Sequence, residues 1–253
     1  MELRVQGPAP AAPFLGAKGL FETEHDVELP VVVRVRRDPD ERTWVGHHED
    51  RHVLNISRQA ATSAMARELA LHEFAHVARH EESHPSHTLR TEEVLFLALS
   101  GRRVERRLLS HCYQIANHTR DIYADDITLD VAPTGKLVSF LESSLAAAVA
   151  DRPAETPGGG YRLTPSADPD ITAVNAAFAL ALLERNDAID GDHRIYDLAH
   201  AAAEDAPAVD VGSFRRRFRA LAADPDESEY RRALVEMVRE YVDSQGAGGP
   251  AAD

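Results

Sequence analysis

The chain has 253 residues, 43% of them hydrophobic, and a formal net charge of −14, so it is long enough for one large domain or two smaller ones. The acidic excess argues against nucleic acid as a partner, and without an apolar run of about 18 residues no membrane span is expected. The start of the chain lacks the basic and apolar stretches of a signal peptide, and its one cysteine, Cys112, cannot form an internal disulfide. We therefore expect a cytoplasmic protein in which Cys112 is a small buried residue.

Residues 1–20 are rich in Pro, Ala and Gly, and we expect them to be loosely ordered. Beyond them, β-branched segments alternate with turn-forming residues and predict strands at residues 29–37, 43–47 and 52–57. Because the turns between them are short, the three strands are expected to form a small antiparallel sheet.

An HExxH motif occupies residues 71–77, which read LHEFAHV. It lies in a stretch, residues 64–79, that has no Gly or Pro and predicts a helix. Residues four apart lie on one face of a helix, so His72 and His76 can present two imidazoles to a single metal ion. Zinc binds such nitrogens and keeps an open position when it is catalytic. Glu73 is turned by about 100° from His72 and can act beside the metal as a base for its bound water.

The helical phasing of the motif strengthens the metal interpretation. Thr62 or Ser63 is the expected cap, and the apolar residues of the helix share one arc that includes Phe74. The two motif histidines fall at the rim of this arc, whereas Glu73 falls near its middle. A carboxylate in that position is costly unless it is paired or close to a metal ion. The alternative is a surface helix with two incidental histidines.

The rest of the chain is predominantly helical. Pro85 ends the motif helix, and a long helical stretch at residues 91–128 is expected to be interrupted at Gly101. A Pro/Gly-rich linker is expected at residues 151–169 and a disordered tail at residues 246–253. Further helices are predicted at residues 136–150, 171–185, 195–203, 211–223 and 227–245. We therefore predict an α+β, mostly helical fold: a metallopeptidase-like core at residues 21–135, with the sheet packed on the motif helix, and a helical subdomain at residues 136–245.

A zinc site needs a third protein ligand besides the two motif histidines. His80 continues the spacing, but it lies about 12 Å from His72 along a straight helix, too far for one ion. The metzincin pattern is excluded because its later Gly and His positions hold Arg79 and Glu82. His84 and His87 follow the helix in a segment that we expect to be a surface connection.

A carboxylate from the next helix is the alternative source of the third ligand. Glu105 falls on the predicted apolar arc of that helix, an unusual position for a carboxylate. Further along, one stripe of the helix carries amide, imidazole and Asp side chains, which ligate metals or hold metal ligands in place. We expect Asp121 to be the ligand, with Asp125, Asp126 and Glu105 as alternatives, and His118 or Tyr123 as a group that could stabilise an oxyanion. The stripe comprises Gln114, Asn117, His118, Asp121 and Asp125.

The order of a small sheet, an edge strand and an HExxH helix, over about residues 30–130, resembles the zincin metallopeptidases. A carboxylate ligand from the following helix is similar to the gluzincins and minigluzincins, and the spacing of Asn117, Asp121 and Asp125 resembles a group of such enzymes. The typical gluzincin segment Asn-Glu-x-x-x-Ser-Asp is absent, so no subfamily is assigned. The resemblance implies a zinc-dependent peptidase in which residues 52–57 pair with an extended peptide or protein substrate. Glu73 would take a proton from the metal-bound water and deliver it to the leaving amine.

The acidic composition, with only Lys18 and Lys136 as lysines among 28 basic residues, resembles proteins of salt-loving archaea. The whole chain is similar to an uncharacterised haloarchaeal family that carries the same HExxH motif. In that setting the negative charge keeps the protein soluble in concentrated salt and gives no information about the substrate. The competing hypothesis is a non-catalytic protein-interaction module that retains a zincin-like fold. The sequence does not predict an oligomeric state.

Overall fold

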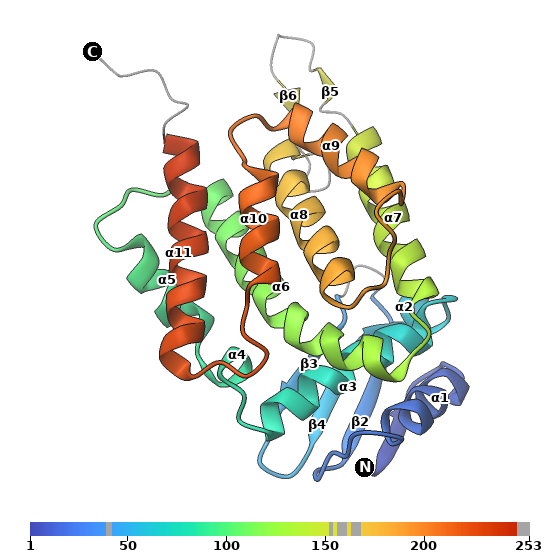
Figure 1. Ribbon diagram of the computed structural model, residues 1–253. Helices are drawn as coiled ribbons and strands as arrows, with labels where there is room; N and C mark the ends of the chain where they lie inside the picture. The colour runs from blue at the N-terminus through green and yellow to red at the C-terminus, as the bar shows by residue number, and fades with distance from the viewer. Residues whose placement is uncertain (39–41, 152–153, 156–160, 163–167, 247–253) are drawn as a thin grey trace, which may run out of the picture. The chain divides into compact units, whose positions relative to one another are not determined.

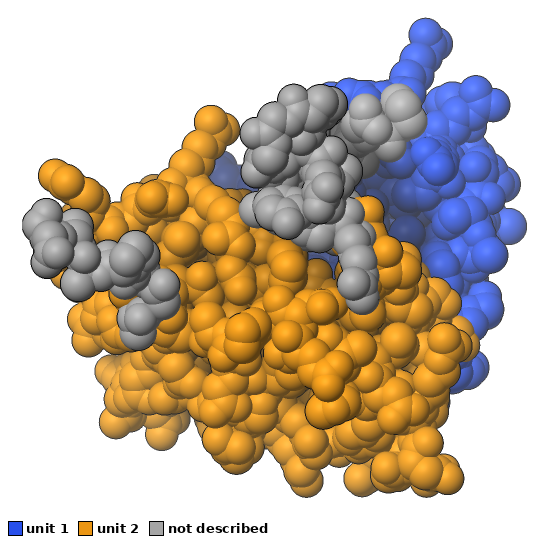
Figure 2. All heavy atoms as spheres, turned by 90° about the horizontal axis from the view of Figure 1, so that it is seen from above, with its two compact units in different colours: residues 1–88, 123–136 blue, residues 89–122, 137–253 orange. Residues whose placement is uncertain are grey.

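The computed structural model describes residues 1–38, 42–151, 154–155, 161–162 and 168–246. The chain divides into two compact units, residues 1–88 with 123–136, and residues 89–122 with 137–253 (Figure 2). The predicted division was into consecutive segments, whereas here residues 89–122 group with the C-terminal helices. The predicted tail at residues 246–253, apart from Gly246, and most of the predicted linker at residues 151–169 lie outside the described residues.

The first unit is built on a four-stranded sheet with the strand order β1-β2-β4-β3 (Figure 1). Its strands are β1 (Leu3–Gln6), β2 (Val31–Arg36), β3 (Trp44–His47) and β4 (His52–Ser57). The sheet is mixed: β1 and β4 both pair in parallel with β2, and β3 pairs antiparallel with β4. The prediction of an antiparallel sheet was therefore wrong.

Burial explains the strand order. All six residues of β4 are buried, so this strand takes a central position with a neighbour on each side. No residue of β3 is fully buried, and this strand forms the edge of the sheet. Residues 44–47 and not the predicted residues 52–57 are thus the edge strand beside the HExxH helix.

The N-terminal residues, expected to be loosely ordered, form β1 and the helix α1 (Ala12–Phe21). The backbone of β1 is held by parallel pairing with β2, from Leu3 opposite Val31 to Gln6 opposite Arg34. Phe14 and Phe21 of α1 are fully buried. The Pro/Ala-rich composition misled the prediction because two aromatic anchors and one strand pairing suffice to order the segment.

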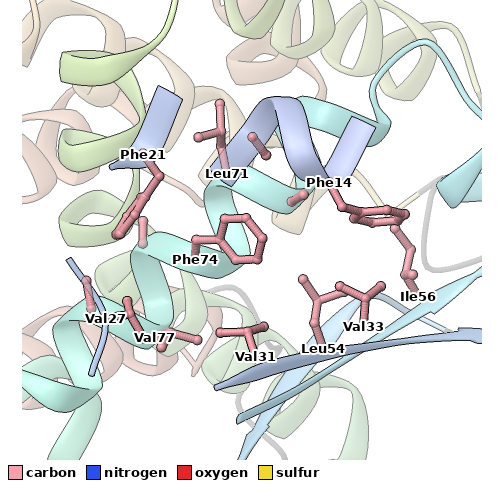
Figure 3. Close-up of a cluster of buried hydrophobic side chains, with 14 of the residues drawn as sticks. Phe14, Phe21, Val27, Val31, Val33, Leu54, Ile56, Leu71, Phe74 and Val77 are labelled. Carbon is pink, nitrogen blue, oxygen red and sulfur yellow. The ribbon is translucent and has the colours of Figure 1, made fainter. Parts of the chain in front are cut away.

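The core of the first unit lies between the sheet and two helices, α1 and α3 (Ala66–Glu81) (Figure 1). Figure 3 shows Leu71 and Phe74 of α3 directed into the same cluster as the aromatic rings of α1 and the valines of β2. The second half of helix α6 (Arg106–Val131) adds Ala124 and Ile127 to this cluster. Burying this apolar face fixes the rotation of α3, and with it the direction in which the motif side chains point.

The N-terminus of α3 differs from the prediction. A short helix, α2 (Arg58–Ala61), forms first and is capped by Ser57, whose Oγ accepts a hydrogen bond from the backbone N–H of Ala60 at 3.1 Å. Thr62 ends α2, and α3 starts after Met65 without a side-chain cap. The expected caps therefore serve the turn between two helices.

The second unit is a helical bundle around α8 (Pro169–Arg185), which is buried along most of its length (Figure 1). A helix that is apolar on all sides requires neighbours on all sides. In the described residues these include α7 (Gly135–Ala150), α9 (Ile195–Asp205) and α10 (Val211–Arg219). Helices α5 (Thr91–Leu99) and α11 (Glu227–Gly246) pack on each other, and β5 (Ala154–Glu155) pairs with β6 (Tyr161–Arg162).

The structure confirms the mostly helical α+β fold and the predicted interruption at Gly101, which has a positive φ of 76° between α5 and α6. Cys112 is fully buried as expected, and burial raises the pKa of its thiol to about 11. None of the described helices combines the length and apolarity that crossing a membrane requires.

Candidate metal centre

The two motif histidines lie one turn apart on α3, half-buried at the rim of its apolar face. Their Nε2 atoms face each other at 3.0 Å, with the rings nearly perpendicular. Glu73, between them in sequence, is buried, and 6% of its surface is exposed. The phasing expected from the sequence is thus confirmed for His72, Glu73 and His76.

Each motif histidine uses its other ring nitrogen to contact a buried partner. The Nδ1 of His72 lies 2.7 Å from Oδ1 of Asp125, and the Nδ1 of His76 lies 2.7 Å from Nε2 of His87. Because an ionised carboxylate only accepts hydrogen bonds, His72 donates Nδ1–H to Asp125 and keeps the lone pair on its Nε2. A carboxylate behind a histidine is the usual partner that fixes a metal-binding imidazole.

A hydrogen-bonded chain continues behind His76. Ser86 Oγ lies 2.7 Å from Nδ1 of His87 and 2.7 Å from Nδ1 of His84. The backbone N–H of Ser86 also donates to His84 Nδ1, which therefore acts as an acceptor. Since His84 accepts, the Ser86 hydroxyl donates to His84 and must itself accept from Nδ1–H of His87. The Nε2 of His87 is then an acceptor, so His76 donates its Nδ1–H to His87. This direction leaves the lone pair of His76 on Nε2, facing that of His72.

The return of the chain toward His76 depends on the end of α3. Ser83 has a positive φ of 55°, and the backbone N–H groups of Ser83 and His84 donate to the carbonyls of His80 and Arg79. These are the two hydrogen bonds of a Schellman motif, which reverses the chain after a helix. The short helix α4 (Pro85–Thr88) then carries His87 back to α3.

The expectation that residues 81–87 form a surface connection was therefore wrong for its later part: His84, Ser86 and His87 are buried. The signal in the sequence was the pair of histidines around Pro85, directly after the helix. Its meaning could not be recognised without the left-handed conformation of Ser83, which a residue other than Gly or Asn seldom adopts.

Helix α6 supplies the carboxylates. Asp125 is held against α3 because its neighbours Ala124 and Ile127 belong to the core of the first unit, and because Arg79 Nε donates to the carbonyl of Tyr123 at 3.1 Å. Asp121 precedes Asp125 by one turn of the same helix. Ligand atoms of His72, His76 and Asp121 all lie within 4.8 Å of one another, which makes these three residues a possible metal-binding group.

The donor set fits a zinc-like ion. Ligands about 2.0–2.1 Å from a tetrahedral zinc ion lie about 3.3 Å from each other, close to the 3.0 Å between the two Nε2 atoms. Two lone pairs facing each other at this distance repel unless a cation lies between them. A half-buried carboxylate of Asp121 completes two nitrogens and one oxygen, a common ligand set of catalytic zinc.

The alternatives for the third ligand take different places. Asp125 is engaged with the outer nitrogen of His72, so it orients one ligand instead of joining the group. Glu105 is exposed and precedes the first residue of α6, so the prediction of a buried Glu105 was wrong. Helix α6 begins one residue later, and because the Glu105 carboxylate stays in solvent it has no desolvation cost. Asn117 is also exposed, and Asp126 is half-buried.

The two candidates for oxyanion stabilisation are both buried. Tyr123 is fully buried, and its ring packs on His84 with a centroid distance of 4.5 Å. His118 is 6% exposed and stacks on Phe178 in the second unit.

His80, excluded as a ligand by its spacing, lies in a different cluster. Its ring stacks on His47 of β3 at 3.7 Å, and His47 Nδ1 lies 2.8 Å from Nδ1 of His52. His52 Nε2 in turn contacts Glu81 at 2.9 Å. Burial raises the pKa of the Glu81 carboxyl, but hydrogen bonds from the backbone N–H groups of residues 28 and 29 and from His52 lower it by more. This cluster ties the end of α3 to the sheet.

The profile of DUF5781, described as a family of unknown function, matches residues 1–243 of the chain. No curated protein and no solved structure is similar enough to count as a match.

Proposed function

The chain belongs to the DUF5781 family, and we propose that it is a zinc-dependent hydrolase that cleaves peptide bonds. His72, His76 and Asp121 are the proposed zinc ligands, and Glu73 is the proposed general base. The observation that carries this proposal is the pair of facing Nε2 atoms, 3.0 Å apart, on histidines whose outer nitrogens both have buried partners.

The chain's own residues account for most of the proposed reaction. When bound, zinc supplies Lewis acidity, which lowers the pKa of a coordinated water and polarises a carbonyl. Glu73 takes a proton from the attacking water and delivers it to the leaving amine. Its place supports this role, because Glu73 is buried on the same helix as the two motif histidines and follows His72 directly. Asp125 and His87 hold the two imidazoles in the orientation that turns their Nε2 atoms toward each other.

The edge strand offers a means of holding a substrate. β3 lies at the end of the sheet and has a pairing partner, β4, on one side. It lies beside the motif helix, since His47 at its end stacks on His80 of α3. An extended peptide can add to such an edge by backbone hydrogen bonds, which favours a peptide over a compact small molecule.

The test combines metal analysis with peptide cleavage. We expect one zinc ion per chain in the purified protein, loss of that zinc in His76→Ala, and cleavage of a peptide library that zinc removal abolishes. Glu73→Gln should keep the zinc and lower the cleavage rate by about 10²–10⁴-fold, since it removes the base alone. Two matched controls lie on α3: Glu68→Gln, a second buried glutamate, and His80→Ala, one turn beyond His76.

Two results would contradict the proposal. A wild-type protein without stoichiometric zinc would overturn the metal centre. Cleavage that survives Glu73→Gln would overturn the role of Glu73. Zinc that is bound by the motif histidines in a protein that cleaves no peptide would instead favour a metal-stabilised interaction module.

A further inference from the structure

The imidazole of His118 is buried in the second unit and packs on two aromatic rings. Its ring stacks on Phe178 of α8 at a centroid distance of 4.1 Å and an angle of 11°, and Phe218 of α10 meets it edge-on at 6.1 Å. Its Nε2 lies 2.7 Å from the side-chain oxygen of Asn175 and 3.2 Å from the side-chain nitrogen of Gln114. Only 6% of the residue is exposed, so the ring has one orientation.

The other ring nitrogen, Nδ1, is fully buried and makes no hydrogen bond to any residue that the structure describes. Its nearest ionic neighbour is Oδ2 of Asp121, one turn further along α6, at 3.7 Å. A buried polar atom without a hydrogen bond is destabilising. The carboxylate of Asp121 needs to move by less than 1 Å to reach hydrogen-bonding distance of this nitrogen.

The carboxylate of Asp121 favours the tautomer of His118 that carries its proton on Nδ1, because a lone pair on Nδ1 would face the negative charge at 3.7 Å. One nitrogen cannot both donate to Asn175 and accept from Gln114, and the amide of Asn175 presents either its oxygen or its NH2 after a half turn. This half turn exchanges the Asn175 oxygen, which lies 2.7 Å from Nε2, for the NH2 group, and Nε2 then accepts hydrogen bonds from both amides. The proton of the neutral ring then lies on Nδ1, which faces Asp121 as a donor.

We propose that His118 is a positioning residue for Asp121: its Nδ1–H holds Oδ2 of the carboxylate, so that Oδ1 is presented to the metal ion. This inference rests on the proposed zinc site and adds the residues that orient its oxygen ligand. It also gives a role to α8, whose Asn175 and Phe178 hold the imidazole. Asp121 then has an orienting partner, as His72 has in Asp125 and His76 in His87.

The experiment measures zinc affinity by competition with a chromophoric chelator. His118→Phe keeps an aromatic ring on Phe178 but removes the donor, and we expect zinc to bind about 10–100-fold more weakly, the usual effect of losing such a partner. His118→Asn places an amide NH2 near the position of Nδ1 and should restore most of the affinity. In an Asp121→Ala background, His118→Phe should change the affinity by less than about twofold, because the two residues act as one unit.

His111→Phe is the matched control, since His111 is another buried histidine of α6 with partners in the same unit, Tyr241 and Asp168. It should lower the melting temperature without changing zinc affinity. If His118→Phe does not fold, Asn175→Ala tests the same link and should also weaken zinc binding.

The outcomes separate this inference from the proposed function. If zinc binds and depends on His72 and His76 but not on His118, the inference is wrong and the metal centre stands. An effect of His118→Phe that persists in the Asp121→Ala background shows a structural role and overturns the inference. A wild-type protein that binds no zinc overturns both proposals.

Discussion

The contact between Asp125 and His72 allows the metal centre to be tested by changing a residue that is not itself a proposed ligand. Asp125 is 5% exposed, and its Oδ1 lies 2.7 Å from Nδ1 of His72. Asp125→Asn removes the charge but keeps an oxygen that can accept the hydrogen bond. Asp125→Ala removes both and leaves the imidazole free to turn.

The expected magnitude follows from this geometry. A buried hydrogen bond to a charged group contributes about 1.5–3 kcal/mol. Since each 1.4 kcal/mol is a factor of ten in a dissociation constant, losing that contribution weakens zinc binding by about 10–150-fold. Asp125→Ala should fall at the upper end of this range. Asp125→Asn should fall at the lower end, because a neutral hydrogen bond retains about half the strength of a charge-assisted one.

The assay is a zinc titration of the metal-free protein against a chromophoric chelator, together with the melting temperature of each metal-free variant. Asp130→Asn is the control, because Asp130 lies exposed in the last turn of the same helix and should leave the zinc affinity unchanged. If Asp125→Ala binds zinc as tightly as the wild type, Asp125 does not orient the ligand, and the reasoning from the His72 contact is refuted.

Three further predictions test other parts of the structure. His87→Ala should weaken zinc binding about tenfold in the same titration, since His76 loses the partner of its Nδ1; unchanged affinity would remove α4 from the site. Phe74→Ala should lower the free energy of unfolding by about 3–5 kcal/mol in urea denaturation, because the ring is fully buried behind the motif; a loss below about 1 kcal/mol would contradict this packing. Burial raises the pKa of the Asp168 carboxyl, but hydrogen bonds from His111 and from the guanidinium of Arg107 lower it well below its usual range. Asp168 therefore contributes stability above about pH 4 that is lost as the pH falls. The Asp168→Asn variant should melt at a lower temperature than the wild type at pH 7, and its free energy of unfolding should fall less between about pH 5 and pH 2. Equal falls in the two proteins would refute the stabilising role of the Asp168 carboxylate.

Local sequence patterns predicted most helices and three of the four strands of the sheet in the first unit. The helices at residues 136–150, 195–203 and 227–245 correspond to α7, α9 and α11 with small shifts at their ends. The first twenty residues were not predicted, because β1 is ordered by pairing with a strand 28 residues later and α1 by burial of its aromatic residues. Both are tertiary effects that a composition rich in Pro and Ala conceals.

The face of α3 that carries His72, Glu73 and His76 follows from the sequence, because helical spacing sets their relative directions and the apolar residues of the same helix set which way that face turns. The sequence also favoured Asp121 as the oxygen ligand, with Asp125, Asp126 and Glu105 as alternatives. The tertiary structure brings Asp125 into contact with His72 and Asp121 into a possible metal-binding group with both motif histidines, since these two residues differ by one turn and the packing of Ala124 and Ile127 sets the register. It also decided that His87 returns to His76, because one left-handed residue, Ser83, reverses the chain, and no periodicity in the sequence records that reversal.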